Sequence, residues 1–102
     1  MINLLEHNKR ELRSICQTHF VAKLFLFGSA VRNDFQANSD LDFAVIFTEN
    51  LTPLEQGDAY FGLKDALEAL YNRQIDLVSY PVIKNPIFKQ ELDKTKVELY
   101  AA

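Results

Sequence analysis

Two carboxylates in this chain stand two residues apart at the start of an apolar segment. Asp40 and Asp42 flank Leu41, and the apolar run continues to Phe47. In an extended strand, residues i and i+2 share one face with Cα atoms roughly 6.5–7 Å apart, so two Asp side chains can reach one cation. Mg²⁺ takes oxygen ligands and commonly uses one or two carboxylates together with substrate phosphates. The pair therefore predicts a site for magnesium and a phosphate-bearing molecule.

The position of the carboxylates distinguishes them from an ordinary solvated Asp-x-Asp pair, which is the usual meaning of that pattern. Asp42 precedes a run typical of a buried strand, where a carboxylate is costly to desolvate unless it is paired or bound to a metal. Asp76 repeats the situation within the short apolar segment QIDLVSY. Three carboxylates at the ends of apolar strands favour a shared function.

A turn that suits phosphate lies ahead of the carboxylate pair. Gly28-Ser29 interrupts the first apolar run, and ten residues separate it from Asp40. Gly28 allows close approach of the backbone to a ligand, and Ser29 adds a hydroxyl donor. Backbone amides at the start of the following turn can point at phosphate oxygens. A Gly-Ser pair alone is common in turns, and its meaning here comes from the carboxylates.

Length and composition indicate one domain spanning residues 1–102. The chain is 48% hydrophobic, which is enough for a single core. No apolar run approaches the roughly 18 residues of a membrane span, and the N-terminal segment lacks the apolar core of a signal peptide. Cys16 is the single cysteine, so an internal disulfide is excluded. We expect Cys16 in the core and the protein in the reducing cytoplasm, with no membrane association.

The charge balance argues against a nucleic-acid-binding domain. The formal net charge is −3, and the 11 Lys and Arg residues are scattered along the sequence. Proteins that grip a nucleic-acid backbone depend on clustered basic residues. Stable binding of nucleic acid by this chain alone is therefore not expected, whereas a small phosphate-bearing molecule accompanied by its metal remains compatible.

Hydrophobic periodicity predicts an α/β domain, with a small mixed β-sheet flanked by α-helices. Thr52-Pro53-Leu54-Glu55 is a capping box that begins a helix ending near Tyr71, although Gly57 and Gly62 weaken it. A helical turn is expected over residues 30–34 and a polar loop over residues 35–39. The other predicted elements are helices over about residues 2–18 and 86–94, and strands over Val21–Phe27, Leu41–Phe47, Gln74–Ser79 and Val97–Tyr100.

The order of these motifs resembles a known family. A Gly-Ser pair, ten residues, Asp-x-Asp and a later Asp in an apolar strand are similar to the nucleotidyltransferase fold of the DNA polymerase β-like superfamily. The size and the closing segment NPIFKQELDKTKVELYAA resemble the minimal nucleotidyltransferases, the MntA-like antitoxins encoded with HEPN-domain toxins. The resemblance covers nearly the whole chain.

The resemblance implies a role for each motif residue. Gly28 and Ser29 would hold the triphosphate of ATP, and Asp40 and Asp42 would bind Mg²⁺. Asp76 would complete the metal site or take the proton of the acceptor hydroxyl. The implied reaction transfers AMP from ATP and releases pyrophosphate. In the antitoxin branch the acceptor is a tyrosine of the HEPN toxin, whose ribonuclease activity is thereby silenced.

The sequence departs from the family pattern at two positions. Ala30 stands where members often have a basic residue, and Asn33 stands where they often have glycine. Asn tolerates a left-handed backbone, so Asn33 can replace that glycine. Arg32 is available to bind phosphate in place of a basic residue at position 30, although a surface ion pair with Asp34 is an equal alternative.

Two other functions remain open alongside the protein adenylyltransferase. One is a non-catalytic antitoxin that neutralises the toxin by masking it, and the other is a small-molecule nucleotidyltransferase, which the lack of a helical domain disfavours. A domain of this size has little surface with which to enclose a second substrate. We therefore expect that the acceptor belongs to a protein partner, which forms a hetero-oligomer with this chain. Apolar side chains near the C-terminus are assigned to core packing first and to a partner contact second: Ile87, Phe88, Leu92, Val97, Leu99 and Tyr100.

Overall fold

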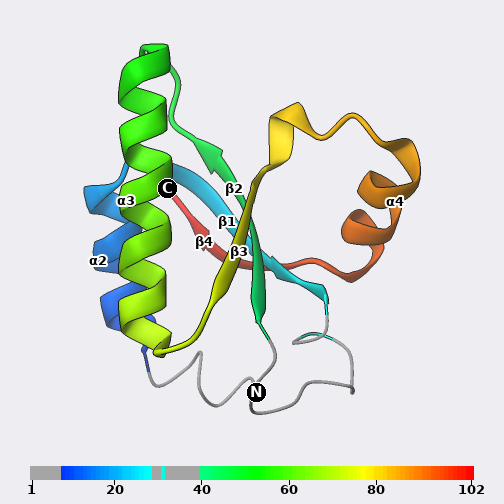
Figure 1. Cartoon of the computed structure of the whole chain (residues 1–102), viewed down its shortest axis with the longest axis horizontal. Coiled ribbons are helices and arrows are strands. Elements are labelled where there is room, and N and C mark those ends of the chain that lie inside the picture. The colour runs from blue at the N-terminus through cyan, green and yellow to red at the C-terminus, as the bar shows by residue number, and fades with distance from the viewer. Residues whose placement is uncertain (1–7, 29–30, 32–39) are drawn as a thin grey trace.

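The computed structural model describes residues 8–28, 31 and 40–102, and it has the predicted alternation of helices and strands (Figure 1). The predicted helical turn and loop over residues 30–39 therefore lie outside the described residues, apart from Val31. So do residues 2–7 of the first predicted helix. The described elements are α2 (Lys9–Thr18), β1 (Val21–Phe27), β2 (Leu41–Phe47), α3 (Pro53–Tyr71), β3 (Ile75–Ser79), the 3-10 helix η2 (Tyr80–Val82), α4 (Pro86–Thr95) and β4 (Val97–Ala101).

The strands within these ranges form one mixed sheet in the order β3-β2-β1-β4. β1 is antiparallel to both β2 and β4, whereas β2 and β3 are parallel and are joined through α3. A parallel neighbour needs such a crossover, because a tight hairpin can only reverse the chain. β3 begins one residue later than predicted, at Ile75, although the Gln74 carbonyl still accepts a hydrogen bond from the Leu41 amide of β2 at 3.1 Å.

The two faces of the sheet bury different sets of side chains, as strand alternation requires. α2 and α3 cover one face, and α4 packs on the other (Figure 1). Leu41, Phe43 and Val45 of β2 point to the α2–α3 face, where Cys16 is also buried. Burial raises the pKa of the Cys16 thiol to about 12, and the expected core role of this residue is confirmed. The α4 face has the smaller core: Phe25, Phe27, Ala44 and Leu92.

The capping box predicted at the start of α3 is confirmed. Thr52 Oγ1 accepts a hydrogen bond from the Glu55 amide at 3.1 Å, and Glu55 Oε1 accepts one from the Thr52 amide at 2.9 Å. Not every apolar residue of α3 faces the core, because Leu54 and Phe61 are exposed. Its buried residues follow a four-residue spacing: Ala59, Leu63, Leu67 and Tyr71. In the described part of the chain, no helix combines the length and apolar character needed to cross a membrane.

The two glycines of α3 predict opposite tolerance to alanine. A Cβ at Gly57 would meet nothing within 4 Å, whereas a Cβ at Gly62 would lie 2.9 Å from Cε1 and Nδ1 of the His19 ring. We expect Gly57→Ala to raise the free energy of unfolding by about 0.5–1 kcal/mol, because alanine favours the helix. Gly62→Ala should gain less or lose stability, since the imidazole must move. Urea unfolding of both variants measures this, and equal gains would contradict the contact.

α4 begins with a local cap and is joined to η2 by a polar cluster. The Asn85 side chain accepts hydrogen bonds from the amides of Ile87 and Phe88 at 2.9 and 3.2 Å. Asp93 accepts hydrogen bonds from the Tyr80 hydroxyl and from Lys96 Nζ, both at 2.7 Å. These donors, Lys96 first, hold the pKa of the Asp93 carboxyl below its usual value.

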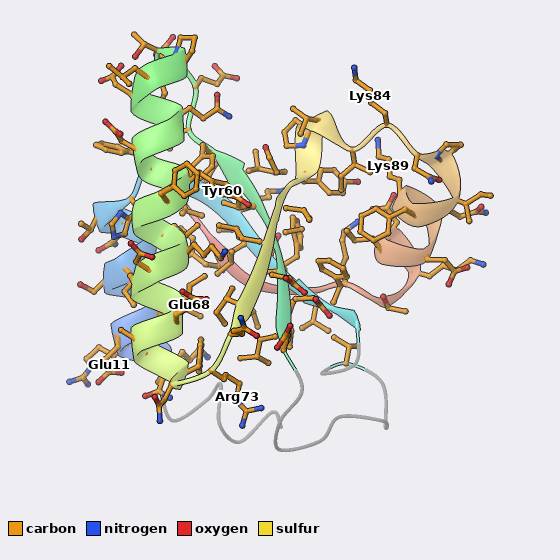
Figure 2. All side chains as sticks on the ribbon, in the orientation of Figure 1. Glu11, Tyr60, Glu68, Arg73, Lys84 and Lys89 are labelled. Carbon is orange, nitrogen blue, oxygen red and sulfur yellow. The ribbon has the colours of Figure 1, made fainter. Side chains whose placement is uncertain are left out.

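Aromatic and apolar contacts complete the attachment of α4. Lys89 Nζ lies 5.4 Å from the centroid of the Tyr80 ring (Figure 2). Leu92 is buried, which confirms core packing for that residue, while Ile87 and Val97 are exposed and Leu99 is half-buried. The buried Leu92 and the contact of Lys89 with Tyr80 therefore fix how α4 lies against this face of the sheet.

Candidate active site

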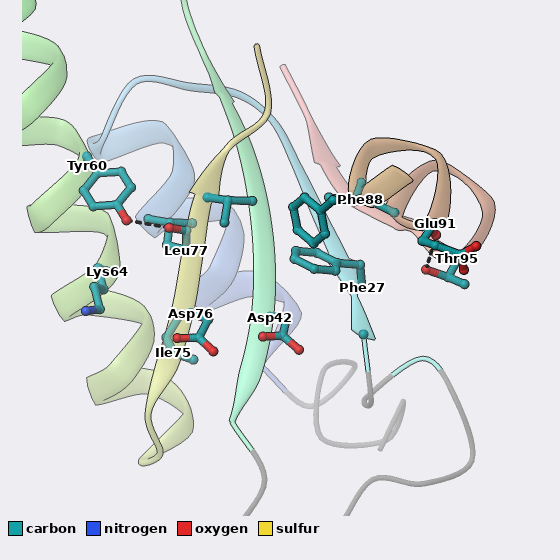
Figure 3. A pocket seen from close by; sticks show the side chains of 13 residues that line it. Phe27, Asp42, Tyr60, Lys64, Ile75, Asp76, Leu77, Phe88, Glu91 and Thr95 are labelled. Atoms are coloured by element: carbon teal, nitrogen blue, oxygen red, sulfur yellow. Dashed lines mark hydrogen bonds between the residues drawn. The ribbon is translucent and has the colours of Figure 1, made fainter. Parts of the chain in front are cut away.

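Asp42 of β2 and Asp76 of β3 are direct neighbours across the parallel strand pair. Adjacent strands lie about 4.8 Å apart, and paired residues point to the same face. Figure 3 shows the two carboxylates side by side at one end of the sheet. Glu68 of α3 helps to position the start of β3, because its Oε2 accepts a hydrogen bond from the Ile75 amide at 3.3 Å (Figure 2). Acids 34 residues apart in sequence thus meet at one edge.

Gly28 packs directly against one of these carboxylates. Phe27, the last residue of β1, pairs with Asp42, so Gly28 follows at the same end of the sheet. Its φ is +79°, a left-handed value that favours glycine. A Cβ at this position would stand 2.3 Å from Asp42 Oδ2, far inside contact distance. Gly28 therefore leaves the space that the Asp42 carboxylate occupies, a role that no local sequence signal shows.

The other predicted site residues are Asp40, Ser29 and Arg32, and of these the structure describes only Asp40. Asp40 is exposed, precedes the first residue of β2, and does not line the pocket that Asp42 and Asp76 share. Ser29 and Arg32 lie outside the described residues, as do Ala30 and Asn33. Across residues 8–28, 31 and 40–102, no group of three His, Cys, Asp or Glu side chains is placed to hold a metal ion. The described part of the site is thus a pair of carboxylates.

The carboxylate pair lies in a pocket of about 550 Å³. This volume falls in the usual range of small-molecule sites, roughly 300–1,000 Å³. α3 contributes Tyr60 and Lys64 to the lining, and the Tyr60 hydroxyl donates a hydrogen bond to the Leu77 carbonyl of β3 (Figure 3). β3 contributes three apolar side chains besides Asp76, and α4 and the end of β1 contribute five more: Ile75, Leu77 and Val78 from β3, and Phe27, Phe88, Glu91, Leu92 and Thr95 from β1 and α4.

Sequence reasoning missed the residues that α3 and α4 add to the pocket. Tyr60 and Lys64 are four residues apart and therefore share a helix face, which is a signal that could have paired them. Their position beside Asp76 depends on how α3 packs on the sheet. Lys64 is half-buried and is the basic side chain among the described lining residues, so it adds positive charge to a pocket that has three acids.

The donor set fits a hard divalent cation. Asp42 is half-buried and Asp76 is exposed, so their oxygens can meet a hydrated ion without full desolvation of either carboxylate. Mg²⁺ is usually bound by one or two carboxylates with waters and substrate phosphates in the remaining positions. Asp42 and Asp76 can therefore provide the protein ligands of such an ion.

Comparison with known proteins agrees with this geometry. Residues 10–102 match the family model for polymerase β nucleotidyltransferases. Protein adenylyltransferase MntA of Thermococcus cleftensis is 33% identical over 90 residues, which are 88% of this chain and 84% of that protein.

Two solved structures are similar in fold. A chain of a toxin–antitoxin crystal structure with AMP-PNP has a TM-score of 0.71 at 21% identity, covering 93% of this chain and 74% of its own length. A chain of tri-AMPylated Shewanella oneidensis HEPN toxin in complex with MNT antitoxin has a TM-score of 0.65 at 18% identity, covering 96% and 73% respectively. With the family match and the carboxylate pair on one rim of the sheet, this chain belongs to the polymerase β nucleotidyltransferase family and is a nucleotidyltransferase.

Proposed function

We propose that this chain is a Mg²⁺-dependent protein adenylyltransferase that transfers AMP from ATP to a tyrosine hydroxyl of a HEPN-domain toxin and thereby acts as its antitoxin. The observation that supports the chemistry best is the in-register pair of Asp42 and Asp76 in one pocket, with Gly28 beside Asp42. The MntA homologue and the toxin–antitoxin complexes support the protein acceptor.

The transfer forms a bond between the acceptor oxygen and the α-phosphorus, and breaks the bond from that phosphorus to the oxygen leading to the β-phosphate. Pyrophosphate leaves with the electrons of the broken bond. A bound Mg²⁺ ion would neutralise charge that develops on the phosphate oxygens. Asp42 would hold this ion together with Asp40 or Asp76, and Gly28 and Ser29 would bind the triphosphate.

In this proposal Asp76 is also the base, because the acceptor hydroxyl must lose its proton. Its carboxylate is exposed within the pocket, on the edge strand β3. A partner hydroxyl can approach an edge strand without displacing another strand. A carboxylate at that place can accept the proton directly or through one water.

The experiment is transfer of label to the partner. The protein is incubated with Mg²⁺, the HEPN protein encoded beside it and ATP labelled at the α-phosphate, with a parallel reaction labelled at the γ-phosphate. We expect α-label on the partner, located on a tyrosine by mass spectrometry, and none from the γ-phosphate. Absence of α-label contradicts the proposal. Neutralisation that survives Asp40→Asn combined with Asp42→Asn assigns the protein instead to antitoxins that act by masking.

A further inference from the structure

Phe88 presents an aromatic ring inside the carboxylate pocket. The side chain lies in the first turn of α4, lines the same pocket as Asp42 and Asp76, and is 39% exposed. Behind it, Phe27 is only 8% exposed, and the two rings meet edge to face with centroids 5.9 Å apart at 73°. Phe88 is thus an apolar wall with buried support and an accessible side.

The register of the sheet connects this wall to the carboxylates. Phe27 and Asp42 are cross-strand partners in β1 and β2, so their side chains leave the sheet on the same face. Asp42 in turn pairs with Asp76 on β3. Phe88, Phe27, Asp42 and Asp76 therefore follow one another across that face, with the aromatic pair toward α4 and the acids toward the β3 edge (Figure 3).

The ring is held in place by its surroundings. The Phe88 amide donates a hydrogen bond to the Asn85 cap, and Leu92, one turn further along α4, is buried in the core. A side chain whose backbone is capped and whose ring rests on another ring loses little conformational freedom when a ligand arrives. Planar bases stack favourably on such aromatic side chains, whatever the base.

We propose that Phe88 is the stacking platform for the nucleobase of the nucleoside triphosphate whose phosphates lie at Asp42 and Asp76. The inference rests on the proposed function and extends it, since it assigns the base to the α4 side of the pocket. The exposed side of Phe88 receives the base, Phe27 supports the ring, and the triphosphate extends toward the β3 edge. The acceptor tyrosine then approaches from the β3 side.

The test compares a ligand that has a base with one that lacks it. Binding of ATP and of inorganic tripolyphosphate, each with Mg²⁺, is measured by titration calorimetry for the wild type and for Phe88→Leu, which keeps an apolar contact with Phe27. We expect Phe88→Leu to weaken ATP binding about 10-fold and to leave tripolyphosphate binding unchanged. Phe88→Tyr should restore ATP binding, because it restores the aromatic ring.

Ile87→Ala is the matched control. Ile87 is the preceding residue of the same helix, is 73% exposed and does not line the pocket, so this variant should bind both ligands as the wild type does. Unchanged ATP binding in Phe88→Leu would overturn the proposal. Equal weakening of both ligands would also overturn it, because the phosphate site would then be disturbed.

A third result separates the base from the acceptor. If Phe88→Leu binds ATP normally but transfers AMP to the partner slowly, the ring serves the acceptor and the stacking proposal is wrong. A wild-type protein that binds neither ATP nor tripolyphosphate contradicts the proposed function itself. The two failures are therefore distinguishable.

Discussion

Asp42→Asn should lower the rate of AMP transfer at least about 100-fold, because it removes charge from the place where the phosphates and their cation must be held. The substitution keeps the size of the side chain and leaves the space beside Gly28 filled. The rate is measured in a single turnover with α-labelled ATP, Mg²⁺ and the HEPN partner. A variant within a few-fold of the wild type would exclude Asp42 from the transfer site.

The same substitution should not reduce stability. Asp42 and Asp76 are carboxylates on directly paired positions, and like charges across neighbouring strands destabilise a sheet. Neutralising one of them removes that repulsion, and asparagine keeps the size of the side chain and an oxygen that accepts hydrogen bonds, so the melting temperature of Asp42→Asn should stay close to that of the wild type. A variant that loses activity but keeps its melting temperature indicates that the carboxylate serves function and not folding. Active-site residues are often less than optimal for stability.

Asp58→Asn provides the control for charge alone. Asp58 is an exposed carboxylate on α3 and does not line the pocket. The variant changes the net charge by the same amount as Asp42→Asn, so any general effect of charge on partner binding appears in both. Transfer by Asp58→Asn should remain at the wild-type rate.

Gly28→Ala should be nearly as damaging to transfer, for a steric reason. The new Cβ would stand 2.3 Å from Asp42 Oδ2, and the φ of +79° is strained for alanine. The carboxylate must turn away or the backbone must leave its left-handed conformation, and either change misplaces the Asp42 oxygens. Since misplacement of about 1 Å can cost 100-fold, we expect a loss of roughly that size in the single-turnover rate.

Gly28→Ala should also lower the free energy of unfolding, by about 1–3 kcal/mol from backbone strain. Gly57→Ala is the matched control, because it makes the same change where a Cβ meets nothing within 4 Å. If Gly28→Ala has the melting temperature and transfer rate of the wild type, the position of the Asp42 carboxylate does not require glycine at position 28. The combination with Asp42→Asn adds a further check: if both variants act through the same oxygens, their losses of rate should not add.

Much of the fold follows from local patterns in the sequence. Short continuous apolar runs predict β1 and β2 with the bounds that the structure has, because a strand that is buried on both faces is apolar along most of its length. The capping box at Thr52 locates the start of α3, since a cap is a local hydrogen-bond arrangement. The motif spacing likewise singled out Asp42, Asp76 and Gly28.

The arrangement of the site required the tertiary structure. The pairing of Asp42 with Asp76 depends on the register of two strands separated by α3, and the pattern within either strand does not show which residue of the other strand will lie beside it. The contact of Gly28 with Asp42, and the wall that Phe88 and Phe27 form, join segments that only packing brings together. Periodicity shows which face of an element is buried, whereas which faces meet is decided by the whole set of crossovers and contacts.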